Sequence, residues 1–305
     1  MKHLQTFNLI EAVARAGSIR KAAEDMNITS SALNRRIQNF EAELGAPIFE
    51  RLPRGVRLNP AGELLIQHIR GQVSDLERVK SQVADLGGIR RGHVSIACSQ
   101  ALQPYFLPSQ ISRYRREHPG VSFSVRVRDR SAAEEDLRTF SSDLALVFEP
   151  VHLVDCEIIL SIAQPVYAVM ACDHPLAGQP ELRLRDCLKQ PHIIPTQSYG
   201  IRHLLETAVV NRSQKLDPIV QSDSFEFMRF YVLHERAIGF QIPIGLNMGE
   251  DDQLAYRKIS TKDIPAGQLL LAQMRGRTLP VASAKFANQL AASLARYDVE
   301  CDLSP

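Results

Sequence analysis

The sequence predicts an α/β protein with an N-terminal winged helix-turn-helix, a long linker helix and a two-subdomain α/β module. Three observations support this fold class. Residues 18–44 read as two short amphipathic helices separated by a tight turn. A long helical pattern then runs from residue 60 to Gly87-Gly88. Beyond these glycines, strand patterns alternate with helix patterns, which predicts parallel sheets covered by helices.

Length and charge are compatible with this division. The 305 residues suggest two or three domains, and a hydrophobic content of 45% allows a large core. The net charge is only +2, so the total charge does not by itself indicate a nucleic-acid binder. Residues 1–60, however, hold nine Lys and Arg against six Asp and Glu, whereas residues 89–305 hold twenty-four of each. The positive excess therefore lies in the helix-turn-helix segment.

Cysteine spacing and hydropathy exclude several classes of protein. The five cysteines are scattered without a C-x-x-C pair, which argues against a disulfide framework or a zinc site. Glu11 and Arg15 interrupt the apolar character that a signal peptide would need. No stretch approaches the ~18 apolar residues of a membrane span. We therefore expect a cytoplasmic protein that holds no metal and makes no membrane contact.

The N-terminal segment carries several helix signals. A helix over residues 2–16, ended by Gly17, is expected to cover the back of the two-helix unit. Ser18 is a candidate N-cap for the first helix of that unit, and Thr29 or Ser30 for the second. The second helix has an apolar stripe that we expect to be buried, made of Leu33, Ile37, Phe40 and Leu44.

The polar face of the second helix is suited to DNA. A helix-turn-helix lays its second helix in the major groove. At 100° per residue, the side chains that point away from the apolar stripe are Ser31, Asn34, Arg35 and Gln38, with Arg36 at the flank. Arginine suits guanine, and asparagine or glutamine suits adenine. The alternative is an ordinary solvated helix face, because any surface helix is polar on its outer side.

Residues 46–58 are predicted to form a β-hairpin wing. Two short apolar runs flank the turn signal Pro53-Arg54-Gly55. Arg51, Arg54 and Arg57 would line this hairpin, where they could contact phosphates or the minor groove. The alternative is a charged loop exposed to solvent.

The linker helix over residues 59–88 begins with Asn59 as N-cap and Pro60 at the first helical position. Its apolar residues fall near heptad a and d positions, which predicts packing against the same helix of a second subunit. These residues are Ile66, Ile69, Val73, Leu76 and Val83, with Lys80 interrupting the seam. The alternative is a helix that lies on its own domain.

The remaining residues, 89–305, show a strand–helix pattern that occurs twice. Strands over 93–98, 121–128 and 143–148 alternate with helices over 101–118 and 131–140. The second occurrence is predicted from strands over 165–171, 192–195, 218–222 and 237–243 and helices over 199–212 and 224–234. A final strand over 268–274 and a helix over 280–297 would close the first half. Subdomain I would then comprise residues 89–163 and 266–305, and subdomain II residues 164–265.

Residues 4–62 resemble the winged helix-turn-helix of LysR-type transcriptional regulators. The resemblance is carried by LQTF, by AGSIRKAAEDMNITSSALNRRIQNFEAELGAPIFER and by PRGVRLNPAG. The later residues match more loosely, through the linker helix and an effector-binding module similar to periplasmic solute-binding proteins. The resemblance implies a regulator that binds double-stranded promoter DNA as a dimer or tetramer, contacts RNA polymerase and responds to a small-molecule effector.

The resemblance also implies site residues. For DNA binding it implies four residues on the recognition helix, Ser30, Ser31, Asn34 and Arg35. It also places Arg51 and Arg54 on the wing. Ser30-Ser31 stands where glutamine-proline is common in the family, and Asn34 where serine is common. The operator sequence therefore does not follow from the resemblance.

For the effector, the resemblance implies a site between the subdomains at Ser99, Gln100, Ser131, Thr196 and Gln197. Helix N-termini at the carboxyl ends of parallel strands favour an anion. The alternative for Ser99 is a simple N-cap. Two arginines, Arg130 and Arg202, could pair with a ligand carboxylate or could lie at the surface. Glu235 and Ala237 stand where the family usually has glycines.

Other functional classes find less support. An enzyme would need a motif such as H-E-x-x-H, G-x-S-x-G or a Walker loop, and the sequence has none of these. A cysteine hydrolase would need Cys98 or Cys172 paired with a distant histidine. We therefore expect no catalytic residues and no cofactor other than the effector. A solute-binding protein would leave the helix-turn-helix unexplained, and an architectural DNA-binding protein would leave the α/β module unexplained.

Overall fold

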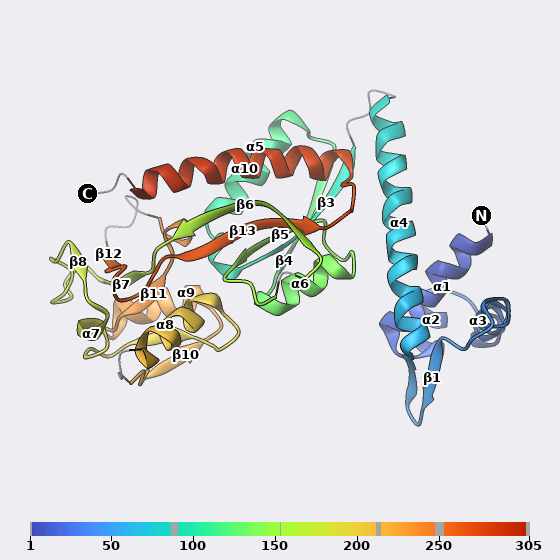
Figure 1. Ribbon diagram of the computed structural model, residues 1–305, viewed down its shortest axis with the longest axis horizontal. Helices are drawn as coiled ribbons and strands as arrows, with labels where there is room; N and C mark the ends of the chain where they lie inside the picture. Colours follow the sequence, from blue (N-terminus) through green and yellow to red (C-terminus); the bar gives the residue numbers. More distant parts are fainter. Residues whose placement is uncertain (1, 87–90, 153, 212–214, 248–252, 303–305) are drawn as a thin grey trace. The chain divides into compact units, whose positions relative to one another are not determined.

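The computed structural model describes residues 1–305 except 1, 87–90, 153, 212–214, 248–252 and 303–305. The chain divides into two compact units, residues 1–80 and 81–305 (Figure 1). Among the described helices, none combines the length and apolar character needed to cross a membrane.

The N-terminal unit begins with the helices α1 (Lys2–Ala16), α2 (Ile19–Asp25) and α3 (Ser30–Leu44). The predicted caps are confirmed. The Ser18 side chain accepts a hydrogen bond from the Lys21 amide, and Thr29 rather than Ser30 caps α3. Gly45 ends α3 in the left-handed conformation, at φ 78°. Side chains from all three helices form one core, which includes Ile10, Val13, Ala22, Ala23, Leu33 and Ile37.

The predicted apolar stripe of α3 is buried only in its first part. Leu33 and Ile37 are fully buried, whereas Phe40 is half-buried and packs edge-on against Phe7. The prediction was wrong for Leu44, which is 45% exposed. Leu44 is the last residue of α3 and does not belong to the core that Leu33, Ile37 and Phe40 form with α1 and α2.

The predicted wing is an antiparallel hairpin of β1 (Phe49–Leu52) and β2 (Gly55–Leu58), with Phe49 opposite Leu58. Its second strand is bound to the turn between α1 and α2, because the Val56 amide donates to the Gly17 carbonyl at 2.9 Å. Gly55 has φ 118°, and a Cβ there would overlap the same carbonyl oxygen. The hairpin is thus held against the helical core, and this position requires glycine.

The linker helix, α4, runs over Pro60–Leu86 and is capped by Asn59, whose side chain accepts from the Gly62 amide at 2.9 Å. Ile66 and Ile69 are fully buried in the core of the N-terminal unit. These two positions are therefore not available to a second subunit, and the alternative of a helix lying on its own domain holds for this part. Val83, by contrast, is 62% exposed. The predicted Gly87-Gly88 end lies outside the described residues.

The C-terminal unit begins with a five-stranded sheet in the order β4-β3-β5-β13-β6. Its strands are β3 (Gly92–Cys98), β4 (Val121–Val127), β5 (Leu144–Phe148), β6 (Cys156–Gln164) and β13 (Gly267–Met274). The first three are parallel, as predicted. The sheet is not wholly parallel, however, because β13 is antiparallel to both β5 and β6. Strand β6 was not predicted from the sequence.

Helices cover both faces of this sheet (Figure 1). On one face lies α6 (Arg130–Arg138), which buries Ala133 and Leu137 against Ala97 and Ala145. The other face is covered by α10 (Val281–Asp302), which packs against α5 (Phe106–Glu117). The predicted continuous helix over 101–118 was wrong. A short 3-10 helix, η1 (Gln100–Leu102), comes first, and α5 begins only after Pro104 because proline cannot continue a helix.

The second half of this unit is built differently from the first. Strand β7 (Tyr167–Ala171) pairs antiparallel with β11 (Gly239–Gln241) and β12 (Leu254–Ile259), and β8 (Glu181–Leu182) lies beside β12. A separate parallel pair contains β9 (Ile193–Pro195) and β10 (Val220–Ser222). The helices are α7 (Leu184–Cys187), α8 (Gly200–Val210) and α9 (Phe225–His234). The prediction that the parallel strand–helix pattern repeats in this half was therefore wrong, because β7 pairs antiparallel with both β11 and β12, and the elements β8, α7 and β12 were not predicted.

The chain passes twice between the two sheets. β6 ends at Gln164 in the first sheet and β7 starts at Tyr167 in the second, while β12 ends at Ile259 and β13 begins at Gly267. At the first crossing the Gln164 side chain is fully buried and accepts a hydrogen bond from the Ile244 amide at 3.1 Å. This bond fixes the 3-10 turn η2 (Pro243–Gly245) to the crossing point.

Cysteine reactivity offers a test of this packing. Cys98 and Cys187 are buried, and burial raises the pKa of both thiols to about 12, whereas Cys172 is exposed. We expect iodoacetamide at pH 8 to alkylate Cys172 in the native protein and to reach Cys98 and Cys187 only after denaturation, since the thiolate is the nucleophile. Mass spectrometry of peptides measures this directly. Equal labelling rates at Cys98 and Cys172 would contradict the packing.

Candidate functional site

Helix α3 presents a polar face while its apolar face is anchored in the core. The buried side chains of Leu33 and Ile37 attach α3 to this core. Among the predicted DNA-binding side chains of α3, only Asn34 is half-buried, and the exposed ones are Ser30, Ser31, Arg35, Arg36 and Gln38. The helix therefore offers hydrogen-bonding groups to a partner from a rigid support.

The N-terminal part of α3 is electropositive. Its first turn contains no acidic residue, and its two glutamates, Glu41 and Glu43, both stand in the C-terminal part. Thr29 Oγ1 caps the Ala32 amide and lies 3.3 Å from the Ser31 hydroxyl. The partial positive charge of a helix N-terminus favours phosphate groups there. This end of α3 can thus bind a phosphate while the following turn faces a groove.

The wing adds two arginines. Arg51 and Arg54 are exposed, and neither has an ion-pair partner among the described residues. Arg57 differs, because its Nε donates to Glu50 Oε2 at 2.6 Å and its charge is largely offset. Of the three arginines predicted to line the wing, two are therefore available cations, and the third is ion-paired within the hairpin.

A contact that sequence reasoning missed fixes the wing relative to α3. The Glu41 carboxylate accepts a hydrogen bond from the Ile48 amide at 2.8 Å, immediately before β1. Because Glu41 belongs to α3, the helix and the hairpin are held as one surface. A helix suited to a groove beside a cationic hairpin fits the shape and charge of a DNA duplex.

Among the cavities described in the C-terminal unit, none is lined by more than one of the five predicted effector residues. Ser99 is 9% exposed, and its hydroxyl accepts from the Phe148 amide at 3.1 Å, tying the end of β3 to β5. Ser131 is exposed and donates to Asp129, the residue that caps α6. The Thr196 amide donates to the Ser222 carbonyl at 3.2 Å, and Gln197 is exposed.

The two arginines considered for a ligand carboxylate already have partners within the protein. Arg130 donates to the carbonyls of Glu149 and Pro150. Arg202 is 9% exposed and pairs with Glu206 at 2.6 Å, so it is not a surface arginine. An anion that used either guanidinium would have to displace these contacts.

The first turn of α8 lies in direct contact with the end of β5. A Cβ at Gly200 would lie 2.6 Å from the Phe148 carbonyl oxygen and 2.8 Å from the Glu149 Cβ. No side chain fits there without movement of the backbone. Tyr199, next to Gly200, donates its hydroxyl to the Asp223 carbonyl at 3.2 Å, and burial raises its pKa. The subdomains thus meet without an open space at this point.

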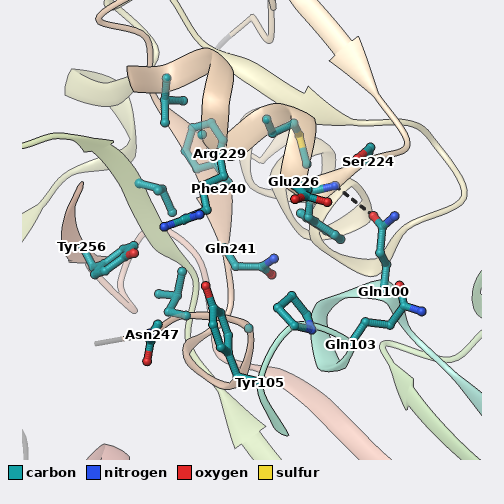
Figure 2. A pocket seen from close by; sticks show the side chains of 18 residues that line it. Gln100, Gln103, Tyr105, Ser224, Glu226, Arg229, Phe240, Gln241, Asn247 and Tyr256 are labelled. Carbon is teal, nitrogen blue, oxygen red and sulfur yellow. Dashed lines mark hydrogen bonds between the residues drawn. The ribbon is translucent and has the colours of Figure 1, made fainter. Parts of the chain in front are cut away.

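A cavity of about 440 Å³ lies instead between the segment 100–105 of subdomain I and α9 of subdomain II (Figure 2). Of the five predicted effector residues, Gln100 alone lines it. The Gln100 Oε1 atom accepts a hydrogen bond from the Phe225 amide at 3.0 Å, which spans the two subdomains. Sequence reasoning missed the other polar and aromatic lining residues, among them Tyr105, Arg229, Phe240, Gln241 and Tyr256.

One sequence signal could have indicated this cavity. Helix α9, FEFMRFYVLH, carries apolar side chains on more sides than one buried stripe requires. Met228 and Val232 are buried, yet both also line the cavity. An all-round apolar helix next to a subdomain boundary is thus compatible with a ligand-facing side.

Comparisons with known proteins cover both units. The family described as "Bacterial regulatory helix-turn-helix protein, lysR family" matches residues 2–63, and the family "LysR substrate binding domain" matches residues 87–295. A RuBisCO operon transcriptional regulator of Allochromatium vinosum is 26% identical over 297 residues, which is 96% of this chain and 97% of that protein.

Two solved structures share the fold over the whole chain. Full-length OxyR from Pseudomonas aeruginosa, solved as a point variant, superimposes with a TM-score of 0.68 at 18% identity, covering 94% of this chain and 97% of that one. Full-length CbnR, solved in complex with its target DNA, superimposes with a TM-score of 0.63 at 16% identity, covering 95% and 99%.

Proposed function

Because the chain belongs to the lysR family of bacterial regulatory helix-turn-helix proteins, we propose that it is a sequence-specific regulator whose action at promoters responds to a small anionic effector bound between its two α/β subdomains. DNA binding and an effector-binding domain follow from the family. The anionic effector, the site residues, the assembly and the partners are our proposals.

The observation that carries the DNA-binding proposal is the joint surface of α3 and the wing. Five exposed side chains of α3 and two exposed arginines of the hairpin lie on elements that Glu41 and Gly17 hold together. In this proposal Arg35, Asn34 and Gln38 read base edges, because their side chains offer the required donors and acceptors. Ser30, Ser31, Arg36, Arg51 and Arg54 contact the phosphate backbone.

We propose that two copies of the chain associate through the later turns of α4. The first turns are committed to their own core, but Val79 is 45% exposed and Val83 is 62% exposed. A two-fold dimer would place two α3 helices on half-sites one or more helical turns apart. Such a dimer, or a tetramer made of two such dimers, would act with RNA polymerase in the cytoplasm.

An anionic effector is supported by the Arg229 guanidinium, which lines the 440 Å³ cavity together with Glu226. The Phe225 amide at the N-terminus of α9 donates to Gln100 Oε1 at the same boundary. Binding there would contact both subdomains, and effector-dependent changes in their contact could alter the DNA-binding state.

The experiment for this function is a gel-shift series with fragments of the neighbouring genome at low ionic strength. We expect retardation of one fragment at concentrations at which random competitor DNA is not retarded. Addition of the effector should change the affinity or the footprint. The same weak retardation of every fragment, with and without small carboxylates, would refute the proposal.

Arg35→Ala and Arg54→Ala form a matched pair of variants. We expect Arg35→Ala to weaken specific binding by about 1–3 kcal/mol and to relax specificity at one base pair. Arg54→Ala should weaken specific and non-specific binding alike and reduce the salt slope by about one. Filter-binding titrations across salt concentrations measure both effects. Equal losses of specific and non-specific affinity in Arg35→Ala would show that Arg35 does not read a base.

A further inference from the structure

We propose that the cavity beside α9 binds a small aromatic monocarboxylate, with its ring among the aromatic lining residues and its carboxylate at Arg229 and Gln241. This inference rests on the proposed function only in taking the ligand to be the effector.

The cavity has the size and position of a small-molecule site. Its volume of about 440 Å³ falls within the usual range of ~300–1,000 Å³ for such sites. Segment 100–105 forms one wall, and α9, β11 and the residues after η2 form the others. A Cβ at Gly200 would overlap the end of β5, and neither Thr196 nor Gln197 lines the cavity.

The residues that line the cavity favour a ligand with a flat apolar part. Four rings border the cavity, those of Tyr105, Phe225, Phe240 and Tyr256. Aliphatic and thioether groups from Val169, Met228, Val232 and Leu246 fill the wall between them. Aromatic rings pack favourably edge-on or offset against one another, so a planar ring gains more here than a flexible polar chain. A small sugar or a phosphate would leave most of this apolar wall exposed to water.

The polar side chains of the cavity favour a ligand with a hydrogen-bond acceptor at one end. Gln241 is 6% exposed, and its Oε1 accepts a hydrogen bond from the Ile242 amide at 2.9 Å. Its amide nitrogen has no hydrogen-bond partner among the described residues, and Figure 2 shows the side chain directed into the cavity. Arg229 contributes a guanidinium to the same lining. A carboxylate can accept from both groups, and charge-assisted hydrogen bonds of this kind are the stronger ones.

The remaining charge limits the ligand to a single carboxylate. Glu226 also lines the cavity, one helical turn before Arg229 on α9, and no ion pair of Glu226 occurs among the described residues. A second anionic group on the ligand would meet either Glu226 or the apolar wall, and both contacts are unfavourable. Dicarboxylates and phosphates are therefore disfavoured.

A ligand at this position would touch both subdomains. Gln100 and Tyr105 belong to subdomain I, and Phe225 belongs to subdomain II. The Phe225 amide donates a hydrogen bond to Gln100 Oε1 at 3.0 Å, and this bond joins the two subdomains beside the cavity. Occupancy of the cavity can therefore be coupled to the contact between the subdomains.

The test uses the full-length protein and defined probes: benzoate as the ring acid, with acetate, succinate and inorganic phosphate as comparisons. We expect benzoate at 100 times its Kd to raise the Tm of the C-terminal unit by roughly 5–10 °C. Acetate, succinate and phosphate at the same concentration should shift it by less than a fifth of that amount. Calorimetric titration gives the Kd for each probe.

Three variants locate the site. Arg229→Gln and Gln241→Met should each weaken benzoate binding at least tenfold, because the first removes the positive charge that faces the carboxylate and the second removes an amide donor while keeping a similar volume. The control is Arg236→Gln, which removes an exposed arginine that pairs with Asp173 at 2.6 Å and does not line the cavity. It should leave the Kd unchanged. Circular dichroism confirms that each variant is folded.

The possible outcomes are distinct. Benzoate binding that Arg229→Gln and Gln241→Met weaken, but Arg236→Gln does not, supports the proposal. It is overturned if benzoate does not bind, if succinate or phosphate binds more tightly, or if all three variants bind benzoate alike. The gel shift without any ligand reports the proposed function separately, so a regulator that retards DNA but ignores ring acids would refute this inference alone.

Discussion

Replacement of Asp143 by alanine is expected to destabilise the C-terminal unit by roughly 3–5 kcal/mol, because it removes the carboxylate that forms an ion pair with the buried Arg277 guanidinium. The Asp143 and Arg277 side chains are 9% and 7% exposed, and their charged atoms lie 2.5 Å apart. The same carboxylate accepts hydrogen bonds from the Ser95 amide at 3.1 Å and the Ser283 hydroxyl at 2.9 Å. Alanine would remove all three contacts at once.

Urea unfolding followed by circular dichroism measures this loss. The matched control is Asp173→Ala, which breaks an exposed pair with Arg236 of similar length, 2.6 Å. Because exposed ion pairs contribute only about 0–1 kcal/mol, the control should unfold near the wild-type midpoint. Similar midpoints for the two variants would mean that the Asp143 cluster does not hold β5 and α10 together.

Replacement of Gly62 by alanine is expected to abolish specific DNA binding while sparing the C-terminal unit. A Cβ at position 62 would overlap the Ile48 carbonyl oxygen and lie 2.9 Å from Leu58 Cδ2. Ile48 is fully buried, so the backbone before β1 cannot move without disturbing the core of the N-terminal unit. Overpacking of this kind costs about 1–3 kcal/mol, and it displaces the wing from α3.

Gel shifts and thermal unfolding check this second prediction together. We expect at least a hundredfold loss of specific affinity and a lower Tm for the N-terminal unit only. Gly178→Ala is the control, because a Cβ at that exposed position meets nothing within 4 Å. Wild-type affinity in Gly62→Ala would show that the wing does not need this close contact.

The sequence alone determined the local features of the N-terminal unit. Ser18, Thr29 and Asn59 each cap a helix from within three residues of the amide they bind, so neighbouring residues contain the whole signal. The exposed face of α3 followed from helical periodicity in the same way. What periodicity did not show was where the stripe would end, because the burial of Leu44 depends on the reach of α1 and α2.

Only the tertiary structure decided the architecture and the cavity of the C-terminal unit. Strand β13 enters the first sheet antiparallel, although about 120 residues separate it from its partner β5. Ser99 was predicted as a ligand contact, but its hydroxyl bonds to an amide 49 residues away. The cavity joins Gln100 and Tyr105 to residues of α9, β11 and β12. Caps and periodicity depend on neighbours along the chain, whereas a cavity depends on how distant strands pair and distant helices pack, and no local pattern records that pairing.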